Sequence, residues 1–468
     1  MRSHAILVLF VLATAAGCAT APKLSDRADI RWPGIAQRRE TNFDRRTWNG
    51  TSVELIGRLM EKLPDRIDSL AEHRLARNIL VTVADAPPDA RDGSAFIPLR
   101  VAKLMSMGNF ADAAALARQA PTLPPEEAES EAEAELLAGE VEMACIDLRV
   151  LHQRSASRWA EEGVALCKAR AGELDTAPPA SDGLGVLVRI EGRPLPAALP
   201  NASIAELAAI GFDPKLPPAQ RLEAAFQAAR ASAVDGTALA RILQAAPARG
   251  KAPKGPPANG VEAAALFHAT ELADPARKLT LGEGGLLSPA GAVDQMSVAL
   301  AVPLRALRPS PALGPLSARF ARLFYTVGDT ASARPWAELA ARSGQGGAVW
   351  PYRAVLRETN PGEKWRSHAR VKETDRVMAV ASAFGGAPVV TAADRSPSAD
   401  IAAMDEAANS QRVGETVLRA LALLGPTGPG QTDAEALGRI LTDLDRVNLH
   451  DEARALAFEA LAAPLSGP

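Results

Sequence analysis

Two cysteines, Cys145 and Cys167, carry the most definite chemistry that residue types and spacing suggest in this chain. Residues 126–150 and 156–170 have helical patterns, and a short turn near Ser155 would make the two helices antiparallel neighbours. Thiols on facing helices could form a disulfide, which would stabilise the fold by about 3 kcal/mol. The alternative is a pair of buried free thiols that pack as small apolar side chains. We expect the disulfide, and no histidine lies at a spacing that suggests a catalytic thiolate.

Aromatic residues in the C-terminal half form a second group that could bind a ligand. Only 4% of the chain is aromatic, yet Trp336, Trp350, Tyr352 and Trp365 lie close together in the sequence. On a concave helical surface such rings could anchor a peptide or a glycan. The candidate binding surface consists of Trp350, Tyr352, Arg353 and Arg357. The alternative is that these few aromatic rings fill the core, and exposure of more than half of Trp350 in a groove would favour binding.

Acidic residues cluster in one stretch that could in principle hold a cation. The stretch contains Glu126, Glu127, Glu129, Glu131, Glu133 and Glu135. Carboxylates near the start of a helix also complement its dipole and keep its surface soluble, and we favour this structural explanation. The histidines are scattered without paired helical spacing, at His4, His73, His152, His268, His368 and His450. The sequence therefore predicts no metal site and no cofactor.

The sequence lacks the motifs of nucleotide binding and of serine-based catalysis. The glycine-rich stretches 282–285 and 344–347 have no Lys-Ser/Thr pair to hold phosphate and magnesium, and Gly250-Lys251 is followed by Ala252. No serine-hydrolase elbow is present, and no Ser is followed three residues later by Lys. The formal net charge of −3 argues against a general nucleic-acid binder, which needs a concentrated basic face.

The N-terminus is typical of an export signal. Arg2 gives a short positive start, and Ala5 to Ala16 form an apolar run that is too short to cross a bilayer comfortably. The following Ala15-Ala16-Gly17-Cys18 resembles a bacterial lipobox, with Ala15 where Leu is usual. The resemblance implies that Cys18 is lipidated and becomes the new N-terminus, and cleavage by an ordinary signal peptidase is the alternative. An exported, periplasmic protein anchored to the outer membrane is expected, in a compartment where disulfides form.

The remaining chain is expected to be all-α. Ala and Leu dominate its apolar residues, and strand patterns are sparse. Thr51 and Glu54 have capping-box spacing ahead of a helix that Pro64 would end. A second helix is predicted over residues 66–84, with apolar residues in one row at a spacing of four. Helix, short breaker and helix then recur through much of the chain.

One turn pattern recurs four times. It begins at Gly108, Gly172, Gly328 and, more loosely, Asn448, and each time a polar residue or two is followed by a small Ala. Gly or Asn can end a helix in a left-handed conformation, and Ala lets the next helix pack closely. The pattern resembles the intra-repeat turn of tetratricopeptide repeats, although that family's Trp, Leu-Gly and Tyr positions are absent and the copies have no fixed period. The resemblance implies an irregular α-solenoid of stacked antiparallel hairpins. Unrelated helices that share common turn chemistry are the alternative.

The chain divides by composition into five parts. These are a signal segment at 1–18, a tether at 19–50, an N-terminal helical-hairpin region at 51–247, a linker at 248–260 rich in Pro and Gly, and a C-terminal helical-hairpin region at 261–466. The tether contains two tryptophans, Trp32 and Trp48, which could touch lipid headgroups or dock on the folded body. A solvated spacer with locally packed tryptophans is the interpretation we favour. Residues 178–202 and 384–400 are expected to be irregular, with one short strand at 185–190.

These observations favour a non-catalytic scaffold or adaptor of the cell envelope that binds a protein or peptide. Membrane contact would occur through the lipid anchor alone, and no nucleic-acid partner is expected. A cell-wall enzyme, or its helical accessory region, is the first alternative. Lytic transglycosylases need a catalytic Glu in a Glu-Ser pair, and Glu129-Ser130 supplies the pair without the motifs that should follow. The second alternative is a passive structural lipoprotein.

Overall fold

The structure, a computed structural model, describes most of the chain between residues 31 and 462. The described ranges are 31–32, 34–90, 96–120, 125–155, 157–174, 204–212, 216–230, 233–247, 251–254, 256–285, 295–359, 371–385 and 398–462. Cys18, Trp365, the whole of 178–202 and the predicted strand at 185–190 lie outside these residues. The all-α prediction is confirmed, since the described residues are dominated by helices and contain one sheet of two short strands. Among them, no helix combines the length and apolar character needed to cross a membrane.

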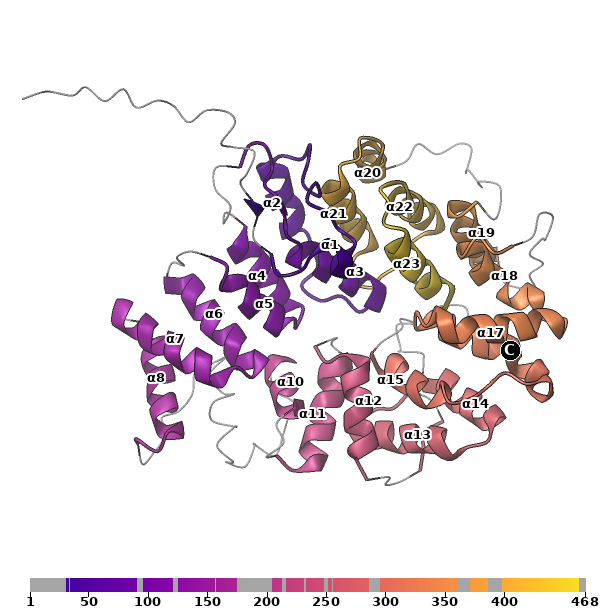
Figure 1. Cartoon of the computed structure of the whole chain (residues 1–468), viewed down its shortest axis with the longest axis horizontal. Coiled ribbons are helices and arrows are strands. Elements are labelled where there is room, and N and C mark those ends of the chain that lie inside the picture. The colour runs from indigo at the N-terminus through magenta and orange to yellow at the C-terminus, as the bar shows by residue number, and fades with distance from the viewer. Residues whose placement is uncertain are drawn as a thin grey trace, which may run out of the picture.

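The helices follow a curved path that returns to its start (Figure 1). The N-terminal part comprises β1 (Arg31–Trp32), α1 (Arg38–Thr41), α2 (Val53–Glu61), α3 (Leu70–Val81) and β2 (Ala84–Asp85). β1 pairs with β2 in antiparallel register, with Arg31 opposite Asp85. Next come α4 (Ile97–Ser106), α5 (Phe110–Ala117), α6 (Pro125–Ala138), α7 (Val141–Arg154) and α8 (Arg158–Arg170).

The middle of the chain forms the opposite side of this path. It comprises α10 (Ile204–Phe212), α11 (Pro218–Arg230), α12 (Gly236–Ala245), α13 (Gly260–Leu272), α14 (Pro275–Gly285) and α15 (Gln295–Leu304). The 3-10 helix η3 (Pro311–Leu316) then leads into α16 (Ser317–Thr326), α17 (Thr330–Arg342), α18 (Gly346–Val355) and α19 (Val371–Ala383). The path ends with α20 (Ala399–Asn409), α21 (Val413–Leu424), α22 (Ala434–Arg446) and α23 (His450–Ala462).

The helical-hairpin turns predicted from the sequence are present in the structure. Gly108, Gly328 and Asn448 have φ values of +79°, +76° and +64°, so each ends a helix in the left-handed region. The next residue donates its backbone N–H to a carbonyl five residues earlier, as from Asn109 to Leu104 at 2.8 Å. The helices on either side of each turn pack on one another. At Gly172 the same turn ends α8, and the residues that follow Leu174 lie outside the described part of the chain.

The helix predicted over 126–150 is instead two helices. Gly139, at φ +84°, ends α6, and Glu140 donates its backbone N–H to the Glu135 carbonyl at 2.8 Å. The prediction of one helix was wrong because helix-forming residues lie on both sides of Gly139, and a glycine can take the left-handed conformation that ends α6. The turn near Ser155 lies where it was expected.

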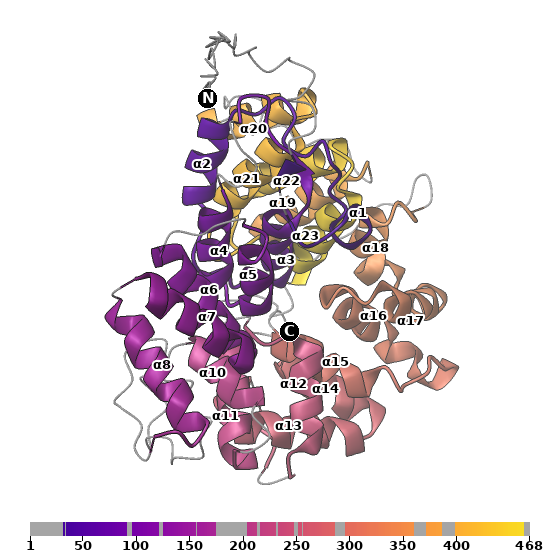
Figure 2. The same ribbon diagram turned by 60° about the vertical axis from the view of Figure 1, so that its left-hand side comes forward.

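The two ends of the folded chain meet and close the path into a ring (Figures 1 and 2). α21 packs on α2 and α3, and α23 packs on α3. One apolar core contains residues from Ala36 to Ala134 and from Leu279 to Leu461, so it joins both predicted halves. A second core continues across the predicted linker, with Ala246 and Ala263 both inside it. Residues 248–260 therefore do not separate two independent bodies, because helices on both sides bury their apolar faces together.

Residues 34–50 dock on the folded body, which was one of the two alternatives, so the solvated spacer that we favoured does not describe them. Phe43 and Trp48 are each only 1% exposed. Trp48 packs against Gly414 of α21, where an added Cβ would lie 2.5 Å from the indole ring, and Gly414 donates its N–H to the Thr47 carbonyl at 2.7 Å. The Asn42 amide donates to Glu452 of α23 at 2.8 Å. This segment therefore helps to join the first and last helices.

Candidate functional site

The predicted disulfide between Cys145 and Cys167 is present in the structure. It joins α7 to α8, with the two Cα atoms 5.8 Å apart. Around it, Val141, Ala144 and Leu148 of α7 pack against Val164 and Leu166 of α8. The pair therefore has a structural explanation, because it fixes a hairpin whose own apolar core is small.

The predicted aromatic binding surface is wrong for its two rings. Trp350 is 3% exposed and Tyr352 is 2% exposed, so neither can anchor a ligand at the surface. The Tyr352 ring stacks on Tyr325 with centroids 5.2 Å apart, and its hydroxyl donates to the Leu461 carbonyl at 3.2 Å. Tyr352 is buried where α16, α18 and α23 meet, and Trp350 packs in a separate small core with Ala354 and with Ala381 of α19. The alternative weighed from the sequence, core filling, holds for both.

The two arginines of that predicted surface lie outside this core. Arg357 forms an ion pair with Asp445 at 2.6 Å, and Arg353 donates to the Glu358 carbonyl at 2.7 Å. Because the rings beside them are buried, the arginines line no aromatic groove.

Three acidic residues converge where α6 meets α7. Carboxylate oxygens of Glu131, Glu135 and Asp147 lie within 4.8 Å of one another, and they are the described residues that could hold a metal ion. Glu135 is fully buried, so the prediction of solvated carboxylates was wrong for this residue. Burial raises the pKa of Glu135 to about 8, and Asp147 adds to the shift. Arg118 donates to Glu135 at 2.8 Å, so a guanidinium and a shared proton can satisfy this cluster.

Glu129 of the Glu129-Ser130 pair lies against the residue that caps α8. The Ser157 hydroxyl, which caps the start of α8, donates to the Glu129 carboxylate. Glu129 therefore has a structural role at the turn between α7 and α8.

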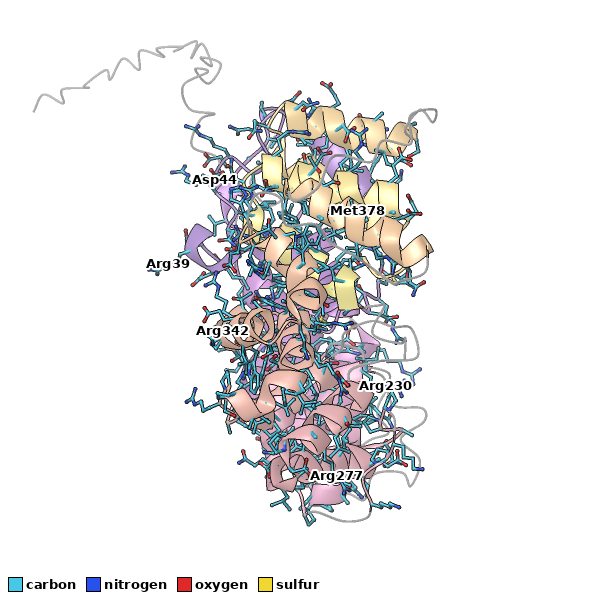
Figure 3. All side chains as sticks on the ribbon, turned by 90° about the vertical axis from the view of Figure 1, so that its right-hand side faces the viewer. Arg39, Asp44, Arg230, Arg277, Arg342 and Met378 are labelled. Carbon is cyan, nitrogen blue, oxygen red and sulfur yellow. A yellow bond between two sulfur atoms is a disulfide. The ribbon has the colours of Figure 1, made fainter. Side chains whose placement is uncertain are left out.

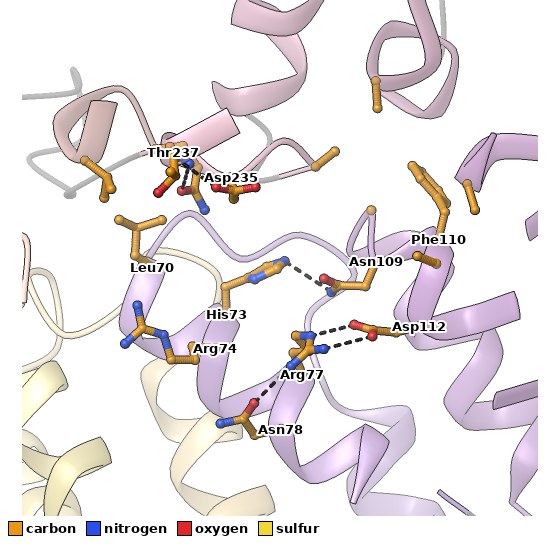
Figure 4. Close-up of a pocket in the computed structure, with 18 of the residues that line it drawn as sticks. Leu70, His73, Arg74, Arg77, Asn78, Asn109, Phe110, Asp112, Asp235 and Thr237 are labelled. Atoms are coloured by element: carbon orange, nitrogen blue, oxygen red, sulfur yellow. Dashed lines mark hydrogen bonds and ion pairs between the residues drawn. The ribbon is translucent and has the colours of Figure 1, made fainter. Parts of the chain in front are cut away.

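The main candidate site is a polar cavity of about 620 Å³ between distant parts of the ring. One wall is formed by α3 and the start of α5, and the opposite wall by the starts of α12 and α15 (Figure 4). Phe110, Leu137 and Ala208 supply apolar surface. The volume lies in the range usual for ligand pockets. The two walls are far apart in the sequence, and they meet where the turn at Gly108 packs against Ala233.

The first wall presents a row of polar side chains from α3. His73, Arg74, Arg77 and Asn78 all line the cavity, since residues three and four apart share a helix face. Arg77 holds Asp112 of α5 through two hydrogen bonds, of 2.5 and 2.8 Å. Arg74 is exposed. This wall therefore offers the guanidinium of Arg74 to a ligand, whereas the guanidinium of Arg77 is bound to the Asp112 carboxylate.

His73 is buried beside the α4–α5 turn. Its Nε2 donates to the Met107 carbonyl at 3.1 Å, and the Asn109 amide nitrogen lies 3.4 Å from the same ring nitrogen. Burial lowers the pKa of His73 below its ordinary value, because the imidazolium would lose its water. The arrangement positions the α4–α5 turn and leaves no nucleophile hydrogen-bonded to the imidazole among these contacts.

The opposite wall is built from a helix start. Asp235 accepts hydrogen bonds from the N–H groups of Thr237 and Ala238 at 2.9 and 3.0 Å, which caps α12. Gln295 of α15 accepts from the Gly236 N–H at 2.7 Å. Gly236 is required there, since an added Cβ would lie 2.5 Å from the Gln295 carbonyl oxygen. The exposed Thr237 side chain faces the cavity from this wall.

A second cavity, of about 860 Å³, lies at the seam where the ring closes. It is lined by turn residues with left-handed backbone, Asn42, Gln411 and Asn448, together with His450. Fewer charged side chains line this second cavity than the first, and the residues in its walls belong to the segments that join the two chain ends. We therefore place the candidate binding site in the first cavity.

This cavity was not predicted from the sequence. The scattered histidines indicated no site at His73, and the pattern at Gly108 predicted a hairpin turn alone. The i, i+3 spacing of Arg74 and Arg77 was a usable signal for a polar helix face. Nothing in the sequence places Thr237 opposite them. No protein-family model, no curated protein and no solved structure matches this chain.

Proposed function

We propose that this protein is a non-catalytic adaptor of the bacterial cell envelope, exported and anchored through Cys18, that binds an extended protein or peptide segment in the cavity between α3 and α12. The carrying observation is the cavity itself, whose walls are fixed before binding by contacts elsewhere in the ring. A preformed site loses little conformational entropy when a flexible segment binds.

The side chains of the cavity suit recognition of a peptide. Amide groups of Asn78, Asn109 and Gln295 line it beside the exposed guanidinium of Arg74. Such groups pair with the N–H and C=O groups of an extended backbone, and an arginine pairs well with a carboxylate. The apolar surface near Phe110 would accept a small apolar side chain.

The ionisable groups support binding over catalysis. Arg77 and Asp112 neutralise each other, Asp235 caps a helix, and His73 donates to a backbone carbonyl. General acid–base chemistry needs a group positioned to exchange a proton with the substrate. Each of these groups instead holds another part of the protein.

The cavity can be tested by blocking it. Thr237→Trp places a large ring in the cavity at an exposed position, and Arg74→Ala removes the exposed guanidinium. Partners captured from detergent-solubilised envelopes by the wild-type protein should be lost with Thr237→Trp and reduced with Arg74→Ala. The matched control is Arg277→Trp, at an exposed residue of α14 labelled in Figure 3.

Two outcomes would count against the proposal. Capture that is equal for wild type and Thr237→Trp would exclude this cavity as the binding site. Clearing of purified cell wall in a zymogram by the wild-type protein would favour the enzymatic alternative. The anchor is tested separately, because a Cys18→Ser protein should leave the membrane fraction and lose its acyl mass.

A further inference from the structure

Helix α7 has two apolar faces, and only one of them is buried. Val141, Ala144, Leu148 and Leu151 pack inward. On the opposite side of the same helix, Met143, Ile146 and Val150 are 45%, 52% and 46% exposed. Their spacing of three and four residues aligns them in one stripe along the helix.

The stripe differs from the other exposed apolar residues that the structure describes. Leu174 and Ile204 are exposed on separate segments, and Val261 and Leu272 lie at opposite ends of α13. Scattered exposed apolar residues are normal, whereas an aligned group marks an interaction surface. Both views place α8, which packs on α7, at the outer edge of the ring, so a partner could reach this hairpin (Figures 1 and 2).

Charges beside the stripe are arranged by sign along the helix. Glu140 and Glu142 lie at its start, and Arg149 and Arg154 lie near its end. Glu142 contacts Arg170 at 3.3 Å, yet its side chain stays 83% exposed. Glu140 accepts a hydrogen bond from Arg118 at 2.8 Å and keeps 41% of its side chain exposed. An identical helix that runs antiparallel, centred on Ile146, would bring opposite charges together.

The helical geometry gives the register of that pairing. With a rise of about 1.5 Å per residue, Glu142 lies near the level of Arg149 of the second copy, and Glu140 lies near the level of Arg154. Glu142 and Arg149 flank the same side of the stripe, and Glu140 and Arg154 flank the other side. A two-fold axis through Ile146 repeats both pairs, which is the self-complementarity of an isologous contact.

We propose that the disulfide-fixed hairpin α7–α8 is a self-association arm, and that the exposed stripe of α7 packs antiparallel on the same stripe of a second copy of this chain. The bridge between Cys145 and Cys167 holds α7 in place before contact, which lowers the entropic cost of pairing. Three side chains bury much less than the roughly 1,200 Å² of a stable interface, so the dimer should be weak and reversible.

The test is sedimentation equilibrium of the oxidised full chain over a wide concentration range. A concentration-dependent dimer is expected for wild type. Ile146→Lys should weaken it by about tenfold or more, because it places two like charges at the centre of the contact. Val261→Lys, at an exposed apolar residue of α13, is the matched control and should leave the dimer unchanged.

Charge exchange tests the register independently of folding. Glu142→Arg and Arg149→Glu should each weaken the dimer, and the double variant should restore it. Thermal unfolding of each variant shows whether the fold is intact. A chain that stays monomeric at every concentration would overturn the proposal, as would failure of the double variant to recover association. Crosslinking of α7 to a different protein, with no self-association, would assign the stripe to that partner instead.

Discussion

Removal of the Glu459 carboxylate is expected to loosen the seam that closes the ring. This side chain comes from the last helix, α23, and caps the start of α3. It accepts hydrogen bonds from the Ser69 hydroxyl at 2.9 Å, the Ala71 N–H at 2.9 Å and the Leu70 N–H at 3.3 Å. All three donors lie at the contact between the two ends of the chain.

The magnitude follows from those donors. A buried donor that loses its partner costs about 1–3 kcal/mol. Two short bonds and one long bond would be lost in Glu459→Ala, and relief of the repulsion with the neighbouring buried Glu72 offsets part of the loss. We therefore expect the free energy of unfolding to fall by about 2–4 kcal/mol. Glu459→Gln keeps one acceptor oxygen and should lose less than the alanine variant.

Two assays report on this change. Urea denaturation followed by circular dichroism measures the loss of stability, and amide hydrogen exchange measures opening at Leu70 and Ala71. Glu435→Ala, at an exposed acid of α22, is the control and should change stability by less than about 0.5 kcal/mol. An alanine variant at residue 459 with an unchanged midpoint and unchanged exchange would refute the role assigned to this carboxylate.

Three further perturbations follow from buried contacts. Burial raises the pKa of Glu72 to about 9 from about 4.5, so the folded state keeps a proton that the unfolded chain releases. The free energy of unfolding therefore falls by about 1.4 kcal/mol per pH unit as the pH rises between these two values. Glu72→Gln should flatten that fall in denaturation midpoints measured from pH 5 to 9. Gly414→Ala should destabilise by about 1–3 kcal/mol in the same assay, since its Cβ would lie 2.7 Å from the Thr47 carbonyl oxygen. Replacement of both Cys145 and Cys167 by Ser should destabilise α7–α8 by about 3 kcal/mol, measured by hydrogen exchange.

Each of these perturbations has an outcome that contradicts it. Unchanged pH dependence in Glu72→Gln would show that another group controls the fall. For Gly414→Ala, the comparison is Gly438→Ala in α22, where a Cβ would have ordinary contacts and the substitution should be neutral or stabilising. Equal hydrogen exchange in oxidised wild type and in the variant with Ser at both positions would show that the bridge does not stabilise the hairpin.

The local structure of this chain could be predicted from its sequence because local chemistry controls it. Gly108, Gly328 and Asn448 reverse the chain as expected, since a left-handed residue followed by a small helix-forming segment needs no distant contact. The Cys145–Cys167 bridge was also accessible, because its two helices are adjacent in the chain.

Ring closure could not be predicted, because its contacts join distant segments. Asn42 and Glu452 meet across a separation of 410 residues, and Trp48 fits against a glycine of α21. No periodicity in the sequence encodes such pairs. The cavity could not be predicted for a similar reason, since its lining residues His73 and Thr237 come from segments far apart in the sequence. Burial of Trp350 and Tyr352 was one of two sequence alternatives, and the surface alternative was the wrong one.

Site-specific photo-crosslinking in intact cells tests the binding function most directly. A photoreactive residue at Thr237 should attach to a defined envelope protein or peptide, and the same residue at Arg277 should not. The yield of the adduct should fall when Arg74 is replaced by Ala in the same chain. Equal labelling at both positions, or no adduct at Thr237 while the protein remains folded and exported, would contradict the proposed adaptor function.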